Sequence, residues 1–272
     1  MTILQTIILG IIQGITEFLP ISSSGHLVLA PYLFGWKIAP QDAFAFDVLV
    51  QVATLLAVFA YFWGDISSIA RAVLTGIWKK TPLESHEARM GWYLVLATIP
   101  AGVAYLLFND TFERAFSSPL ATACFLLVTA ALLLIAERVG KRSRSFEEIN
   151  WVDALVVGLF QILAIFPGVS RSGSTITGGM TRNLQRPAAA RFSFLISIPI
   201  MLAGGLIGVK NLLEIPHFTS LLSAYFAGFA AAALVGYFTI RWLLQFLSQR
   251  PLYVFAIYCF IFGLLNLTLL LL

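Results

Sequence analysis

The sequence predicts an all-α polytopic membrane protein, and two observations support this fold class. Of the 272 residues, 59% are hydrophobic and only 11% are charged, and the mean hydropathy is +0.90, which is outside the range of ordinary soluble domains. The apolar residues also form runs of about 20, the length that a helix needs to cross a bilayer. A lipid-facing barrel would instead show short alternating strands.

The two halves of the chain carry the same pattern at a gap-free offset of 148 residues. The offset relates Gly10 to Gly158, Gln13 to Gln161, Phe18 to Phe166, Ser22 to Ser170, Ser24 to Ser172 and Gly25 to Gly173. We therefore predict an internal duplication. Residues 1–148 form the first repeat and residues 149–272 the second, within one integral membrane domain.

In the first repeat, a hydrophobic segment broken by a polar loop precedes three apolar spans. The pieces flanking the loop, residues 3–19 and 26–34, are too short to cross the bilayer separately. They are expected to enter and leave by the same face as a re-entrant hairpin. The spans are predicted at residues 43–63, 91–108 and 119–136.

The second repeat follows the same order, with a broken segment at residues 151–166 and 175–183. Its spans are predicted at residues 192–210, 221–242 and 252–272. Three crossings per repeat place the two repeats upside down relative to each other. The prediction is thus six transmembrane helices plus two re-entrant helix hairpins that meet near the midplane, the inverted-repeat plan.

The basic residues orient this topology. Of the 16 Lys and Arg residues that it places beside the membrane, 13 lie on one side and only Lys37, Arg114 and Lys210 on the other. The positive-inside rule makes the first side cytoplasmic and puts both termini outside. The net charge of +4 is explained by topology and gives no reason to expect nucleic acid.

Three ionisable residues stand out within the hydrophobic region: Glu17, His26 and Arg171. A charge there costs several kcal/mol unless it faces a cavity or a partner, so each is a functional candidate. Glu17 also has a purely structural interpretation as the partner of Arg171, and either interpretation puts the two close together. His26 could be a packing residue, but it follows three hydroxyl side chains.

The two polar loops have the components of an anion-binding cradle. Glycine lets the backbone approach a ligand, hydroxyls donate hydrogen bonds, and the N-terminus of the following helix favours negative charge. Arg171 adds a planar fork suited to phosphate oxygens. The expected ligand-binding residues are Ser22, Ser24, Gly25, Ser170, Ser172, Gly173, Ser174 and Thr175. Helix capping and close helix packing are the alternative uses of such residues.

Residues 13–26 (QGITEFLPISSSGH) and 167–176 (PGVSRSGSTI) closely resemble the two signature motifs of the bacitracin-resistance (BacA/UppP) family of undecaprenyl-diphosphate phosphatases. Residues 46–51 and 190–195 resemble further segments of that family. The resemblance implies a membrane hydrolase that converts undecaprenyl diphosphate to undecaprenyl phosphate. It would recycle the lipid carrier for cell-wall synthesis and confer bacitracin resistance, working at the outer face of the bacterial inner membrane.

The resemblance also implies the residues that do the chemistry. Glu17, His26, Arg171 and Ser23 match catalytic positions, with either His26 or Ser23 as the nucleophile. A divalent cation, Mg²⁺ or Ca²⁺, would be held by Glu17 and Gln13. Members of the family can carry Glu at the position of Gln13, and an amide oxygen can ligate a metal but supplies no charge.

Two matters are left open by the sequence. The alternative function is a polyprenyl-phosphate flippase that uses the same inverted-repeat site, since carriers also place broken helices at the midplane. The expected partners are the lipid substrate and the bilayer, and a homodimer is neither required nor excluded.

Overall fold

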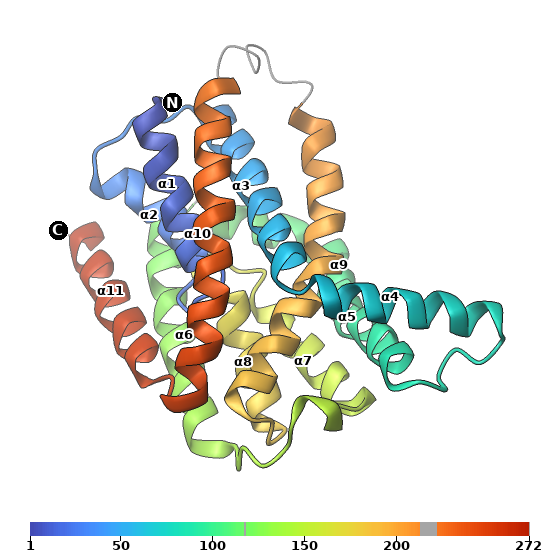
Figure 1. Ribbon diagram of the computed structural model, residues 1–272. Helices are drawn as coiled ribbons and strands as arrows, with labels where there is room; N and C mark the ends of the chain where they lie inside the picture. Colours follow the sequence, from blue (N-terminus) through green and yellow to red (C-terminus); the bar gives the residue numbers. More distant parts are fainter. Residues whose placement is uncertain (117, 213–221, 272) are drawn as a thin grey trace.

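The computed structural model describes residues 1–116, 118–212 and 222–271, and these residues form helices without any named β-strand. Figure 1 labels the helices in chain order. They are α1 Ile3–Thr16, α2 Ser23–Leu33, α3 Pro40–Tyr61, α4 Trp63–Trp78, α5 His86–Phe116, α6 Pro119–Val139, the 3₁₀ helix η1 Phe146–Glu148, α7 Trp151–Leu163, α8 Arg171–Thr181, α9 Arg186–Leu212, α10 Leu222–Gln249 and α11 Tyr253–Leu271.

Six of these helices are long and apolar enough to cross a membrane, which confirms a multi-pass membrane protein. They are α3, α5, α6, α9, α10 and α11, and each coincides with one predicted span. The predicted spans at residues 221–242 and 252–272 each have one end, residue 221 or residue 272, outside the described residues.

The four short helices are the predicted arms of the two hairpins. They have 14 and 11 residues in α1 and α2, and 13 and 11 residues in α7 and α8. At about 1.5 Å per residue none crosses 30 Å of hydrocarbon. In Figure 1, α1 and α2 occupy the upper part of the bundle and α7 and α8 the lower part. That each hairpin enters and leaves by one face stays a prediction.

The second arms begin earlier than predicted. Helix α2 starts at Ser23 and α8 at Arg171, instead of residues 26 and 175. The reason is capping, since the hydroxyl groups of Ser22 and Ser170 each accept a hydrogen bond from a first-turn amide. Residues expected to form loops are therefore the first turns of helices.

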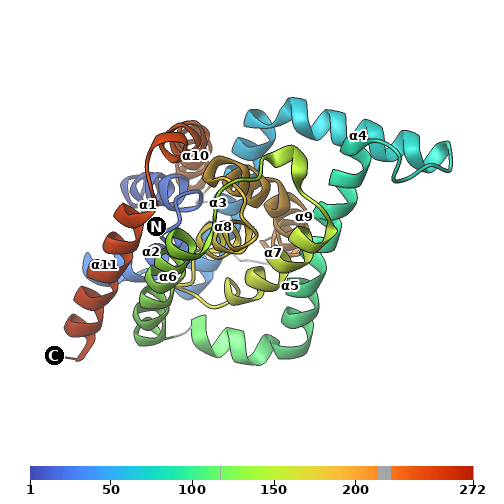
Figure 2. The same cartoon turned by 90° about the horizontal axis from the view of Figure 1, so that it is seen from below.

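Helix α4 was not predicted. A single residue, Phe62, separates it from α3, and Figures 1 and 2 show it running crosswise at the edge of the bundle. Its exposed Trp63, Leu74 and Trp78 alternate with polar residues such as Arg71. This mixture has no long apolar run, so the sequence gives no signal of a membrane span there.

The first helix of each hairpin packs on a helix of the other half of the chain. Helix α1 lies along α10, and α7 lies along α5. Gly10 of α1 faces the carbonyl of Gly228, and Gly158 of α7 faces the carbonyl of Ala97, so closely that a Cβ on either glycine would overlap the facing helix. A close contact between a glycine and a facing carbonyl thus occurs twice, and each half of the chain supplies the glycine once. The repeat boundary at residue 148 stays a prediction.

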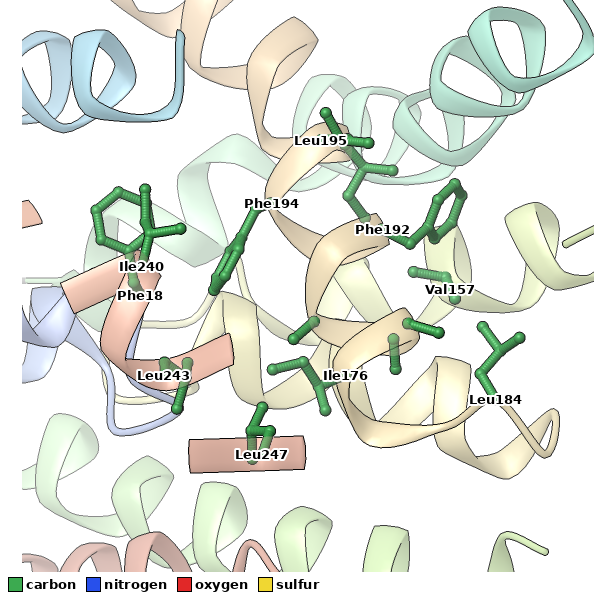
Figure 3. Packing of buried hydrophobic residues seen from close by; sticks show 14 of the residues in the cluster. Phe18, Val157, Ile176, Leu184, Phe192, Phe194, Leu195, Ile240, Leu243 and Leu247 are labelled. Carbon is green, nitrogen blue, oxygen red and sulfur yellow. The ribbon is translucent and has the colours of Figure 1, made fainter. Parts of the chain in front are cut away.

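Helix α8 lies near the centre of the bundle, with α4 and α11 at the periphery (Figure 2). Every residue from Ser172 to Met180 is buried. Figure 3 shows Ile176 of α8 among the packed side chains of α9 and α10. Nearby, Phe18 packs edge-on against Phe194 with ring centroids 5.4 Å apart. This apolar packing joins the segment that follows α1 to α9.

Two buried carboxylates join the turns at the lower end of the bundle. Asp153 accepts Arg144 at 2.6 Å and Arg182 at 2.9 Å. The hydrogen bonds that Arg144 donates to Asp153 raise the pKa of the Arg144 guanidinium above its ordinary value. In the sequence analysis these two arginines serve only to orient the topology. The structure shows that they also form ion pairs with Asp153 that join the turns at this end of the bundle.

A second carboxylate, Glu137, makes the same kind of junction. It accepts Arg186 at 2.6 Å and Arg142 at 2.8 Å, and the backbone amide of Leu252 donates to it at 2.8 Å. Three chain segments that are far apart in the sequence therefore meet at one side chain.

The close approach of α1 and α10 gives a first prediction. Gly10→Ala should lower the free energy of unfolding by about 1–3 kcal/mol, because the new methyl group meets backbone atoms of α10 that cannot rotate away. Chemical unfolding in detergent micelles would measure the change. Gly102→Ala in α5 is the matched control, since its Cβ would enter open space and should be neutral or slightly stabilising. Equal effects of the two substitutions would contradict the close packing.

Candidate active site

Glu17 is the centre of a polar cluster at the end of α1. Its carboxylate accepts hydrogen bonds from Arg171 Nη2 at 2.7 Å, Ser23 Oγ at 2.6 Å and Gln13 Nε2 at 3.0 Å. The side chains of Glu17 and Arg171 are only 9% and 15% exposed, so the ion pair is sheltered and screened little. The predicted proximity of Glu17 and Arg171 is confirmed.

The first loop is capped by Ser22. Its hydroxyl oxygen accepts the amide of Gly25 at 3.2 Å and lies 3.3 Å from the hydroxyl of Ser24. Ser22 has φ +71°, a backbone conformation that residues other than glycine rarely adopt. This turn directs Ser23, the first residue of α2, back toward Glu17.

The second loop is capped in the same way by Ser170. Its hydroxyl oxygen accepts the amide of Gly173 at 3.0 Å and lies 3.1 Å from the hydroxyl of Ser172. Arg171 is then the first residue of α8, as Ser23 is of α2. The offset of 148 residues relates these two positions, and both side chains bind the same carboxylate.

Direct contacts join the second loop to its surroundings. The Ser172 hydroxyl donates to the carbonyl of Leu19 at 3.0 Å, and Arg171 Nη1 donates to the carbonyl of Ser193 at 3.3 Å. The Thr175 hydroxyl lies 2.6 Å from that of Ser193. Ser172 therefore joins the second loop to the end of the first arm, and Thr175 joins it to α9. These are structural contacts of two residues that the sequence predicts to bind the ligand.

Two residues of this framework were missed by the sequence analysis. Thr129 of α6 donates to the carbonyl of Gly168 at 2.8 Å and accepts the amide of Ser170 at 2.9 Å, so it fixes the entry to the second loop. Ser193 of α9 holds Arg171 and Thr175. Thr129 lies within an apolar helix with no motif around it. Ser193 lies in residues 190–195, which resemble a family segment, but that resemblance assigned it no role.

His26 is not bonded to the Glu17 cluster in the part of the chain that the structure describes. Its Nδ1 lies 2.7 Å from the carbonyl oxygen of Ser22, and its Nε2 lies 2.7 Å from the hydroxyl of Tyr258 on α11. Tyr258 is a further residue that sequence reasoning missed, because it lies in an apolar run 232 residues away. His26 follows Ser23 by three positions, so the two share one side of α2.

Ser174 completes the predicted set. It is fully buried, and its hydroxyl has no hydrogen-bond partner among the described residues. The offset of 148 residues places it at the position of His26. The two hairpins thus have the same capping hydrogen bonds. They differ in the side chain one turn into the second arm, which is His26 in the first hairpin and Ser174 in the second.

The arrangement can bind and transfer a negatively charged group. The N-termini of α2 and α8 both lie at this cluster, and helix N-termini attract anions. Arg171 offers further donors for phosphate oxygens. The Ser23 hydroxyl, bonded to a carboxylate at 2.6 Å, has the pairing of a nucleophile and a base.

The side-chain oxygen atoms of the site decide whether a divalent cation fits there. The Gln13 side-chain oxygen is buried without a hydrogen-bond partner, beside the Glu17 carboxylate. These are hard oxygen donors of the kind that Mg²⁺ and Ca²⁺ accept. No group of three or more His, Cys, Asp or Glu side chains suited to a metal occurs among the described residues. The side-chain oxygens of Gln13 and Glu17 are two hard donors that fit a divalent cation.

A family model and relatives with similar sequences both indicate one protein family. A family model described as "Bacitracin resistance protein BacA" matches residues 6–265. The undecaprenyl-diphosphatase of Thermomicrobium roseum is 42% identical over 271 residues, covering 97% of this chain and 96% of that protein. The protein of the same name from Moorella thermoacetica is 43% identical over 259 residues, covering 95% and 94%. These matches confirm the resemblance inferred from the two motifs.

The anchoring of the second loop gives a second prediction. Thr129→Val keeps the shape of the side chain but leaves the Ser170 amide and the Gly168 carbonyl without their buried partner, which should lower the free energy of unfolding by about 1–3 kcal/mol. Thr122→Val on the same helix is the control. Thr122 is also fully buried, but the Ser118 carbonyl to which it donates also accepts the Thr122 amide. A similar loss in both variants would contradict the anchoring role.

Proposed function

Because this chain belongs to the bacitracin resistance protein BacA family, we propose that it hydrolyses undecaprenyl diphosphate to undecaprenyl phosphate and inorganic phosphate. The relatives are named for this substrate. The observation that carries the proposal is the convergence of Ser23 and Arg171, from two capped helix N-termini, on the buried carboxylate of Glu17. Phosphoryl transfer depends mainly on such positioning and charge stabilisation.

Ser23 is the proposed nucleophile, and its hydrogen bond to Glu17 favours it over His26 in this role. Its proton has an acceptor in place, the Glu17 carboxylate, whereas His26 makes no hydrogen bond to the Glu17 cluster among the described residues. The Ser23 oxygen attacks the terminal phosphorus and its proton passes to Glu17. The bond from phosphorus to the bridging oxygen breaks, and undecaprenyl phosphate leaves.

Water completes the reaction. It attacks the phosphorus of the phosphoserine, the bond to the Ser23 oxygen breaks, and inorganic phosphate departs while Ser23 regains a proton. His26, on the same side of α2 as Ser23, is the proposed acid and base for the leaving group and the water. Arg171 and the first amides of α2 and α8 offset the charge on the phosphate oxygens.

A divalent cation is proposed to accompany the diphosphate, held by the oxygens of Glu17 and Gln13. When bound, it would neutralise phosphate charge and polarise the phosphoryl group. The unpartnered side-chain oxygen of Gln13 supports this assignment. Gln13 also orients Glu17 through its amide nitrogen, so it serves the site in either case.

The proposed location is the inner membrane of a bacterium, with the site opening to the outer face. The excess of Lys and Arg on the opposite side supports this orientation. The recycled carrier then serves cell-wall synthesis. No observation favours a flippase instead, because reversible transport of a phosphate would not need a serine bonded to a carboxylate.

The phosphatase proposal predicts phosphate release from undecaprenyl diphosphate by the purified protein in detergent. Ser23→Ala should lower kcat by about three orders of magnitude, because the nucleophile is lost. Arg171→Ala should lower kcat about 10²–10³-fold, because the charge on the phosphate is no longer offset. Arg241→Ala, at an exposed position of α10, is the control and should retain activity.

Two outcomes would count against this assignment. A folded wild type that releases no phosphate would overturn the function. A fully active Ser23→Ala variant would move the nucleophile to His26 or water. Acid quenching during turnover, followed by mass spectrometry of the peptide that contains Ser23, would test for the phosphoserine directly.

The cation proposal makes a separate prediction. A chelator should stop phosphate release, and added Mg²⁺ or Ca²⁺ should restore it. Gln13→Leu should raise the cation concentration that gives half-maximal release, because one oxygen donor is lost. Gln161→Leu removes the equivalent residue of the second repeat, whose amide nitrogen donates to the carbonyl of Ala97, and should leave that concentration unchanged. Chelator-resistant release would contradict the requirement.

A further inference from the structure

Tyr258 bonds His26, a residue assigned to the chemistry, from a helix outside the two loops. It lies on α11, the last helix of the chain, and its hydroxyl is 2.7 Å from Nε2 of His26. The other ring nitrogen, Nδ1, is 2.7 Å from the carbonyl oxygen of Ser22. Both nitrogens of a buried imidazole are therefore occupied.

These partners determine where the protons lie. A carbonyl oxygen only accepts, so Nδ1 of His26 carries a hydrogen. In the neutral ring, Nε2 then has the lone pair and accepts the hydrogen of the Tyr258 hydroxyl. When Nε2 is protonated, the same hydroxyl can rotate and accept from it. Tyr258 thus satisfies Nε2 in both protonation states without movement of the ring.

Ring packing fixes the plane of the imidazole as well. The His26 ring stacks on Phe262, with centroids 4.7 Å apart and planes 8° apart. The Tyr258 ring is also nearly parallel to it, with centroids 5.7 Å apart. Tyr258 and Phe262 are four residues apart on α11, so they lie on one face of that helix. Helix α11 therefore holds the ring through a hydrogen bond and a stack.

We propose that Tyr258 is a positioning residue for His26 in the phosphatase reaction. This inference rests on the proposed function, in which His26 gives and takes a proton at Nε2. Tyr258 holds the ring on the side of α2 that carries Ser23. Its hydrogen bond to Nε2 opens when Nε2 exchanges a proton with the leaving group or the water, and it re-forms afterwards. The backbone carbonyl of Ser22 does the complementary work at Nδ1, as a second partner orients a functional histidine in many sites.

The test compares Tyr258→Phe with Tyr253→Phe. The first removes the hydroxyl but keeps the ring that stacks on His26. The second removes a hydroxyl from the same helix that makes no contact with His26 among the described residues. Thermal unfolding would establish that both variants are folded. Phosphate release and nitrogen NMR of the imidazole rings are then measured on the same samples.

The expected kinetic result is a fall of about ten-fold in kcat for Tyr258→Phe, with KM changed less than about two-fold, because the substrate is still bound while the proton donor is less well held. Tyr253→Phe should match the wild type. A kcat for Tyr258→Phe equal to that of the wild type would overturn the positioning role.

The NMR result does not depend on activity. The chain has only three histidines, so the ring signals lost in a His26→Gln variant identify those of His26. Tyr258→Phe should shift the Nε2 signal of His26 toward that of a nitrogen without a hydrogen bond, and Tyr253→Phe should not. Unchanged His26 signals would overturn the contact itself. If the wild type released no phosphate, the proposed function would fail, and these signals would still decide whether Tyr258 holds the ring.

Discussion

The ion pair between Glu17 and Arg171 is the interaction on which the rest of the structure depends. It joins the end of α1 to the start of α8, two segments that belong to different halves of the chain. A charge in an apolar interior is tolerated only with a partner and with its remaining hydrogen bonds satisfied. Ser23 and Gln13 supply those bonds to Glu17. The glycine contact of α1 with α10 and the central position of α8 hold the two ends within reach.

Two parts of this design were predictable from the sequence for physical reasons. Six apolar runs long enough to cross a bilayer predicted six spans, and two short Ser/Gly motifs predicted where the chain is broken. Glu17 and Arg171 stood out because charges are costly among apolar residues. Helix α4 was missed because its apolar and polar residues alternate, and Tyr258 was missed because nothing near it in the sequence marks it. The arginines at Asp153 and Glu137 were counted as topology signals, since composition cannot distinguish a solvated cation from a paired one.

The two hairpins are alike in their capping and differ in the residues that they present. The capping serines, Ser22 and Ser170, make the same contacts, so each hairpin presents the first residue of its second arm in the same manner. That residue is Ser23 in one hairpin and Arg171 in the other. One backbone geometry, used twice, thus delivers a hydroxyl and a guanidinium to a single carboxylate. The equivalent of Glu17 in the second half is Ile165, so the site has one acidic centre.

The same geometry suggests how substrate and catalysis are coupled under the proposed function. Glu17 accepts three hydrogen bonds, and one of them comes from the Arg171 guanidinium. A diphosphate competes for Arg171, because phosphate oxygens match its donors as well as a carboxylate does. If Arg171 turns to the phosphate, the Ser23 hydroxyl and the Gln13 amide are the donors that still bind Glu17. The ion pair that joins the two halves of the chain then also brings the substrate to the carboxylate that takes the proton of Ser23.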